Sequence, residues 1–230
     1  MNRFKRIGIS LAAALIFFGS LSVTGANAQG ILQEIMQRMD NQQKSLSSLR
    51  AKVTMVKDNA QLGVADTTIG TVIYLPQKGR DALVKIDWTK PDESLAVVNK
   101  QYVIYRPRLK QAYTGSVNSA KGSAKANGAL AFMNMSRAQL RANYTVKYLG
   151  EATVSNGVST WHLELTPKTQ ASYRSAEIWV DKDGFPVQSK IIEKNGDATT
   201  ILLSDLEKNI TLNGNMFKID LPRDTKIIKG

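Results

Sequence analysis

Hydrophobic residues recur at every second position along most of this chain, which is the period of a β-strand with one buried face. Candidate strands fall at about 51–57, 67–75, 82–88, 94–99, 101–106, 109–114, 144–154, 158–166, 173–181, 187–193 and 198–207, with a short one near 215–219. Four Asx-Gly dipeptides lie between such runs, at Asn156-Gly157, Asp183-Gly184, Asn195-Gly196 and Asn213-Gly214. Asx-Gly tolerates the positive φ angles of tight hairpin turns. The pattern therefore predicts one antiparallel sheet built as a meander.

The predicted sheet is too wide to stay flat. Twist accumulates over about eleven strands, so the sheet must curl, close or split into two layers. Large apolar residues occupy one parity of several strands: Val84, Ile86 and Trp88; Trp161, Leu163 and Leu165; Ile178 and Val180. Polar residues alternate with them, which predicts one buried face and one wet face. This parity fits a packed core and a ligand cavity equally well.

Apolar residues recur with the period of an α-helix at 31–49. The apolar residues at this spacing are Ile31, Leu32, Ile35, Met36, Met39, Leu46 and Leu49. Polar residues fill the positions between them, so the pattern predicts an amphipathic helix with one buried face.

A second helix-like segment, at 128–140, is rich in methionine and follows a Gly/Ser/Ala/Lys stretch at 114–128 that is typical of a loop. On a helical wheel Phe132 and Met135 lie nearly opposite Leu130 and Met133. The first turns of this segment therefore need apolar surroundings on both sides, or a ligand. Methionine suits a surface that repacks against changing partners. An ordinary core helix and a lid over a ligand both remain open on this pattern.

The first 28 residues have the composition of a secretory signal peptide. Arg3, Lys5 and Arg6 precede an apolar run at 7–18, and Ala26-Asn27-Ala28 supplies small residues for cleavage. A single transmembrane anchor is the alternative, but the apolar run is short for a bilayer. We expect cleavage after Ala28, with residues 29–230 forming a single exported domain.

Composition narrows the possible partners. Loss of residues 1–28 lowers the net charge from +12 to +9, and export excludes cytosolic nucleic acid as the partner of that charge. The basic surface is either simply solvated or a patch for anionic lipid or an acidic protein. The chain has no cysteine, so it has neither a disulfide nor an N-terminal lipid site. No later segment reaches the roughly 18 apolar residues of a spanning helix, so we expect a soluble mature protein.

Three candidate chemical motifs fail on spacing or context. His162 is the single histidine and lies at the wet parity of its strand, where it needs no partner, so a Ser-His-Asp site is disfavoured. The run at 181–184 begins like a calcium loop, but its glycine is misplaced and a hairpin turn fits better. The run at 121–123 lacks the spacing of a phosphate-binding loop. We expect no metal and no other cofactor.

Short motifs follow one another over nearly the whole mature chain. They are W-T-K-P-D-E-S at 88–94, Q-Y-V-I-Y-R-P at 101–107, the apolar insert at 129–135, L-T-P-K at 165–168, V-D-K-D-G at 180–184 and F-K-I-D-L-P at 217–222. In this order they resemble the periplasmic outer-membrane lipoprotein carrier family (localization-of-lipoproteins A-like). The resemblance implies a mainly β fold with α: a curled, incomplete antiparallel β-barrel of about 11 strands with an N-terminal helix and a helical lid.

The same resemblance implies that acyl chains bind between the concave sheet face and the lid. The residues expected to contact them are Val84, Ile86, Trp88, Ile104, Leu130, Phe132, Met133, Met135, Trp161, Leu163, Leu165 and Ile178. A basic residue after the second long strand holds the lid shut in the family. The segment 74–80 is longer here than the family pattern, so the latch is either Arg80 or Lys78.

The expected function is therefore a soluble periplasmic carrier that moves lipoproteins, or other lipids, from the inner to the outer membrane. The resemblance implies a releasing transporter in the inner membrane and an acceptor at the outer membrane, and we expect the carrier to act as a monomer. The alternative is a regulatory module on the same fold that senses lipids or lipoproteins. A lipid-modifying enzyme is disfavoured because the sequence offers no convincing polar constellation.

Overall fold

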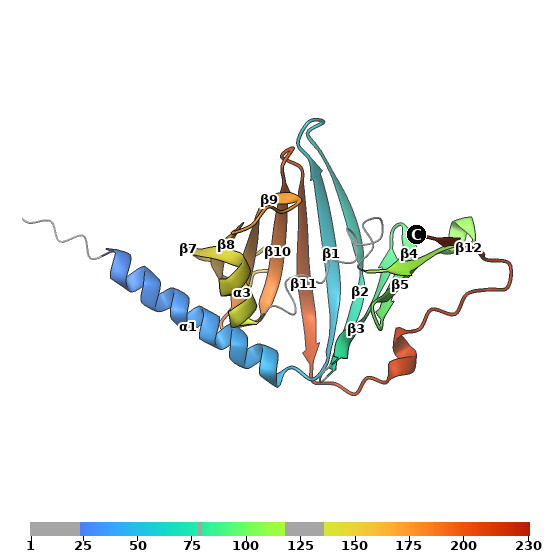
Figure 1. Ribbon diagram of the computed structural model, residues 1–230, viewed down its shortest axis with the longest axis horizontal. Helices are drawn as coiled ribbons and strands as arrows, with labels where there is room; N and C mark the ends of the chain where they lie inside the picture. The colour runs from blue at the N-terminus through green and yellow to red at the C-terminus, as the bar shows by residue number, and fades with distance from the viewer. Residues whose placement is uncertain (1–23, 78–79, 118–135) are drawn as a thin grey trace, which may run out of the picture.

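The structure is a computed structural model that describes residues 24–77, 80–117 and 136–230. Over these ranges twelve strands form one sheet, in the order β12-β6-β5-β4-β3-β2-β1-β11-β10-β9-β8-β7 (Figure 1). The sheet is curled and open, with β12 and β7 at its two edges. Helices α1 (Thr24–Ser45) and α3 (Arg137–Asn143) lie at the β7 end. The expected fold class, a curled incomplete barrel with helices, is confirmed.

Two antiparallel meanders make up most of the sheet. The first comprises β1 (Leu49–Asn59), β2 (Val64–Gln77), β3 (Arg80–Thr89), β4 (Asp92–Val98), β5 (Gln101–Arg106) and β6 (Gln111–Ser116). The second comprises β7 (Tyr144–Thr153), β8 (Ser159–Pro167), β9 (Tyr173–Asp181), β10 (Pro186–Glu193) and β11 (Ala198–Lys208). They are joined by antiparallel pairing of β1 with β11. The last strand, β12 (Lys226–Lys229), pairs in parallel with β6.

Three predictions about the strands are therefore corrected. The sheet is two meanders joined at β1 and β11, and β12 makes it mixed instead of purely antiparallel. No strand forms at 215–219, where the chain makes the short 3₁₀ helix η2 (Gly214–Phe217). Alternation along one segment predicts a strand but carries no information on which distant strand completes its hydrogen bonds.

The predicted helix ends earlier than its apolar spacing suggested. It stops at Ser45, and Leu49 already pairs with Tyr74 and Lys208 as the first residue of β1. Asn209 Oδ1 accepts hydrogen bonds from Ser47 N at 2.8 Å and Ser47 Oγ at 3.0 Å, which ties the connection to the end of β11. Leu46 and Leu49 are buried, as expected, but they contribute to the sheet side of the core.

Three of the four Asx-Gly turns are confirmed. Gly157, Gly184 and Gly196 each have a positive φ at the turn of a hairpin. The fourth dipeptide, at Asn213, instead begins η2, with Asn213 Oδ1 accepting from Asn215 N at 3.1 Å. Gly184 is also required by packing, because a Cβ there would collide with the backbone of α1 at Arg38.

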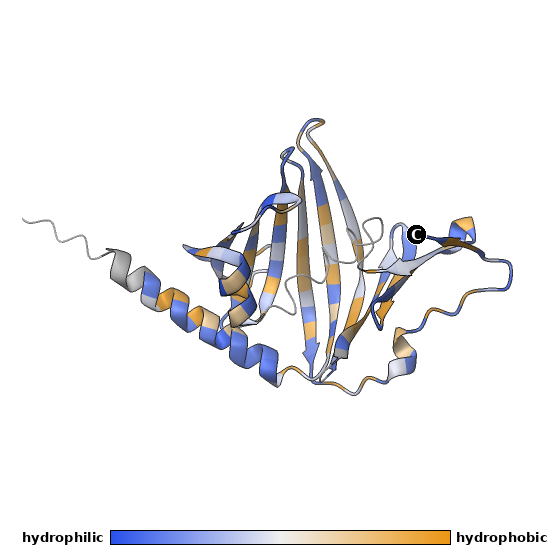
Figure 2. Cartoon of the chain, in the orientation of Figure 1, coloured by the Kyte–Doolittle hydropathy of each residue, from blue (hydrophilic) through white to orange (hydrophobic). Residues whose placement is uncertain are grey.

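The ladder registers place one continuous set of side chains on the concave face, from Tyr113 in β6 to Tyr148 in β7. Apolar and polar residues alternate along the central strands, visible as orange and blue bands in Figure 2. The buried residues form two groups. We call them the pocket-side cluster, around Val72, Val84, Ile86, Leu95 and Ile104, and the helix-covered cluster, around Ile35, Met36, Leu140, Leu163, Leu165 and Ile178.

Candidate functional site

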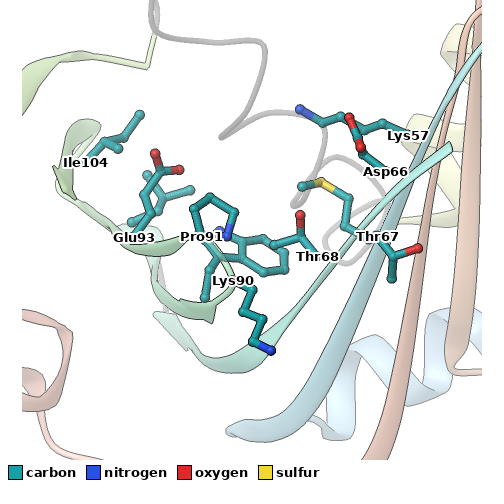
Figure 3. A pocket seen from close by; sticks show the side chains of 11 residues that line it. Lys57, Asp66, Thr67, Thr68, Lys90, Pro91, Glu93 and Ile104 are labelled. Carbon is teal, nitrogen blue, oxygen red and sulfur yellow. The ribbon is translucent and has the colours of Figure 1, made fainter. Parts of the chain in front are cut away.

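A pocket of about 290 Å³ opens on the concave face between β1–β2 on one side and β3–β5 on the other (Figure 3). It is lined by Met55, Lys57, Asp66, Thr67, Thr68, Trp88, Lys90, Pro91, Glu93, Leu95 and Ile104. Four large apolar side chains, Met55, Trp88, Leu95 and Ile104, belong to or pack against the pocket-side cluster. The rest of the wall is formed by Pro91 and by charged and hydroxyl side chains from β1, β2, the β3–β4 turn and β4, so the pocket suits an amphiphile.

Trp88 owes its position to a glycine on the neighbouring strand. Gly70 in β2 pairs directly with Trp88 in β3, and Trp88 pairs with Glu93 in β4. A Cβ on Gly70 would collide with Asp87 O and would stand 3.0 Å from Trp88 Cε3. The indole therefore lies close against Gly70, at a position where a larger side chain would force the strands to shift.

Glu93 is a buried carboxylate in an otherwise largely apolar part of the wall. Arg106 Nε donates to Glu93 Oε2 at 2.7 Å, and the guanidinium lies 5.1 Å from the centroid of the Tyr113 ring. The hydrogen bond to Glu93 is the main cause that raises the pKa of Arg106 above its ordinary value. The ion pair satisfies a charge that would otherwise be costly to bury.

The expected acyl-contact residues fall into two separate places. Trp88 and Ile104 line the pocket, and Val84 and Ile86 lie beside them in the pocket-side cluster. Leu163, Leu165 and Ile178 are fully buried in the helix-covered cluster, against which Trp161 packs. Their part in acyl binding stays a prediction.

The helix-covered cluster is closed by specific contacts of α1. The guanidinium of Arg38 lies 5.5 Å from the Trp161 ring centroid, and its Nη1 donates to Lys182 O at 3.0 Å. Arg137 of α3 donates to Gln37 Oε1 at 2.7 Å, which holds the two helices together. The apolar face of α1 therefore packs on the buried side chains of β8 and β9 in the helix-covered cluster.

Several expected site residues lie outside the part of the chain that the structure describes. They are Lys78, Leu130, Phe132, Met133 and Met135. Arg80 begins β3 through its backbone pairing with Gln77, but its side chain is likewise outside the described part. The lid and its latch remain predictions.

Of the eleven residues that line the pocket, the sequence prediction named only Trp88 and Ile104. Met55 and Leu95 follow the same alternation as Val84 and Ile86 in their own strands, so parity would have found them once the register was known. Glu93 lies within the W-T-K-P-D-E-S motif, but nothing local indicates that a carboxylate there is buried.

The prediction that His162 needs no partner is corrected by the structure. Its Nε2 lies 2.8 Å from Glu177 Oε2, and its ring stacks on Trp179 with centroids 4.2 Å apart. Cross-strand pairing between β8 and β9 puts Trp179 directly opposite His162, on the face away from the pocket. The histidine is thus part of a local packing cluster.

Within residues 24–77, 80–117 and 136–230, no group of three or more His, Asp or Glu side chains is arranged to hold a metal ion. No helix in those ranges combines the length and apolarity needed to cross a membrane.

An open, curled sheet with helices at one end and an amphiphilic pocket on its concave face is the architecture of a protein that binds a ligand on its own β-sheet. The family model of the outer membrane lipoprotein carrier protein LolA matches residues 45–220, so the chain belongs to this family. An outer-membrane lipoprotein carrier protein of Cupriavidus pinatubonensis is 26% identical over 228 residues, covering 98% of this chain and 99% of that protein.

Solved structures share the fold at low identity. An uncharacterized conserved protein of Thermus thermophilus matches with a TM-score of 0.55 and 14% identity, over 87% of this chain and 99% of that one. MucB matches with a TM-score of 0.56 and 13% identity, over 86% of this chain and 64% of that one.

Proposed function

We propose that the protein is a soluble periplasmic carrier that holds acyl chains of lipoproteins, or of other lipids, on the concave face of its sheet. The observation that carries the proposal is the pocket, in which Trp88, Leu95 and Ile104 present apolar surface next to charged side chains. Membership of the lipoprotein carrier family supports the same conclusion.

The pocket matches part of one acyl chain in size and chemistry. Its volume, about 290 Å³, is near the lower end of the roughly 300–1,000 Å³ typical of small-molecule sites. Each methylene that leaves water contributes about 0.8 kcal/mol, so even a short stretch of chain supplies useful affinity. Longer or additional chains require the apolar side chains of the pocket-side cluster to move apart.

In our proposal, the pocket serves to transport lipoproteins, or other lipids, from the inner to the outer membrane. Family membership and the name of the Cupriavidus relative support it. A carrier of this kind needs a protein that loads it at the inner membrane and one that accepts the cargo at the outer membrane, and it works as a monomer without a cofactor. Binding and release require no chemical step by the protein.

Binding of an acylated peptide tests the proposal directly. A fluorescent triacylated peptide should bind the mature protein saturably, and the same peptide without acyl chains should not. Ile104→Glu puts a charge in the pocket wall and should abolish binding. Ile227→Glu, at an exposed position of β12, is the matched control and should bind as wild type. Equal binding by both variants would contradict the site, and absence of any acyl-dependent binding would contradict the function.

A further inference from the structure

The hairpin between β1 and β2 carries apolar side chains that nothing in the described structure covers. Leu62 is 73% exposed and Val64 55% exposed, and both lie at the tip. This hairpin projects beyond the neighbouring β10–β11 hairpin at the same end of the sheet (Figure 1). Two exposed apolar side chains grouped at the end of a projecting element form a candidate contact surface.

The tip is held in one conformation. Asn59 Oδ1 accepts hydrogen bonds from Gln61 N at 3.1 Å and Leu62 N at 2.8 Å. Gly63 N donates to Asn59 O at 2.9 Å, with Gly63 at a positive φ. Ala60 N donates to Asp197 Oδ1 at 2.9 Å, which anchors the tip to the β10–β11 turn. These hydrogen bonds constrain the backbone around Leu62. Little conformational entropy of the turn is therefore lost when the Leu62 side chain leaves water for an apolar environment.

The pocket adjoins this hairpin. Lys57 and Asp66, which form a cross-strand pair two steps from the tip, belong to the pocket wall. Figure 3 shows their side chains on the β1–β2 side of the pocket, across from Glu93 and Ile104. Along the hairpin, Lys57 and Asp66 therefore lie between Met55 of the pocket wall and the exposed tip. An acyl chain leaving past Lys57 and Asp66 moves toward Leu62.

We propose that the β1–β2 tip inserts Leu62 and Val64 into the surface of a lipid bilayer, and that the pocket loads or releases acyl chains while it is docked there. This rests on the proposed function, since it names the surface at which the same pocket exchanges its cargo. Two apolar side chains give weak, reversible contact, which is what a carrier that must leave the membrane requires.

A lipid surface fits the tip better than a protein partner does. A specific protein interface buries about 800 Å² on each side and needs a complementary apolar patch. The two exposed residues instead sit at the end of a narrow hairpin, which penetrates a fluid interface without a matching pocket. The hairpin carries one lysine and two aspartates at 57–66, so its contact with lipid rests on the apolar side chains of Leu62 and Val64 and not on charge.

The chain has no cysteine, so a single one can be labelled without side reactions. Leu62→Cys carrying the fluorophore NBD should gain emission several-fold, with a blue shift, on vesicles of phosphatidylethanolamine and phosphatidylglycerol. Leu109→Cys, at a 58% exposed position in the 3₁₀ helix η1 (Pro107–Leu109) between β5 and β6, three strands or more from the hairpin, should not respond. No response at position 62, or the same response at both positions, overturns the proposal.

A second pair of variants tests the energetics. Leu62→Ser with Val64→Ser should lower vesicle affinity by about tenfold or more, because two apolar side chains no longer leave water. Leu109→Ser with Ile227→Ser removes two comparably exposed apolar side chains and should change it little. An equal loss in both double variants overturns the proposal. Circular dichroism confirms that each variant is folded.

Acyl-peptide binding in solution separates this inference from the proposed function. The tip variant should bind the triacylated peptide as wild type does, yet transfer it to vesicles more slowly. Normal binding with unchanged transfer overturns the docking role alone, whereas loss of acyl binding in wild type overturns the proposed function. A third outcome would point to a protein partner. In it, NBD at position 62 shows no change in emission on protein-free vesicles, yet the Leu62→Ser, Val64→Ser variant fails to deliver cargo to outer-membrane preparations. The tip then contacts a protein, and the proposal is wrong.

Discussion

Arg106 forms an ion pair with Glu93, a residue of the pocket wall, with Nε and Oε2 2.7 Å apart. Glu93 is buried in β4 and Arg106 is about one-third exposed at the end of β5. The guanidinium of Arg106 also lies 5.1 Å from the centroid of the Tyr113 ring on β6. The ion pair therefore places a satisfied charge among the apolar side chains of the wall.

Arg106→Met should destabilise the protein because it removes a charged donor from a buried carboxylate. A loss of about 1–3 kcal/mol in the free energy of unfolding is expected, toward the lower end since Arg106 is partly exposed. Urea denaturation measures it. The double variant Arg106→Met with Glu93→Gln should recover part of the loss. A double variant less stable than the sum of its single changes would contradict the pairing.

Gly70→Ala should perturb the pocket through Trp88. The new methyl group collides with the backbone of β3, so the strands must move apart, at a cost of about 1–3 kcal/mol. Acyl-peptide affinity should fall together with stability, because the indole lines the pocket. Gly30→Ala is the control: its Cβ meets nothing within 4 Å in α1, and alanine favours the helix. Thermal unfolding and peptide titration of both variants check the prediction, and equal behaviour would refute it.

Ile86 and Ile178 offer a matched test of which cluster holds cargo. Each is 1% exposed, one in the pocket-side cluster and the other under α1. Truncation to alanine should cost about 2–5 kcal/mol at either position. Only Ile86→Ala should alter the rise in melting temperature that an acylated peptide produces. If Ile178→Ala alters it equally, acyl chains also reach the helix-covered cluster, and the broader set of residues expected from the resemblance is supported.

His162→Gln should leave acyl binding unchanged, since the residue faces away from the pocket. Its stack on Trp179 and its contact with Glu177 should be weakened, at about 1 kcal/mol of stability. Peptide titration and urea denaturation of the variant measure the two effects separately. Loss of binding in a folded His162→Gln protein would show that the outer face of β8–β9 affects function.

Much of this architecture could be predicted from the sequence because its signals are local. The alternation of Val84, Ile86 and Trp88 follows from the two-residue period of a strand, and the turns at Gly157 and Gly196 follow from the backbone freedom of glycine. The apolar stripe of Ile35, Met36 and Met39 likewise predicted a helix that buries one face. These inferences needed only neighbours within a few residues.

Tertiary structure decided which of these elements meet. Pairing of β1 with β11 joins the two meanders. The sequence of neither strand indicates this partner, since any strand edge offers the same backbone donors and acceptors. The same pairing begins β1 at Leu49 and so moves Leu46 and Leu49 off the helix predicted from their spacing. The β4–β5 hairpin places Arg106 beside Glu93, whereas the order of strands in the whole sheet separates Ile86 from Ile178. The sequence by itself determined the strands and their apolar faces, because side-chain periodicity is a local property. Only the folded sheet determined the pocket, because its wall is assembled from strands whose contacts are set by the burial of the whole face.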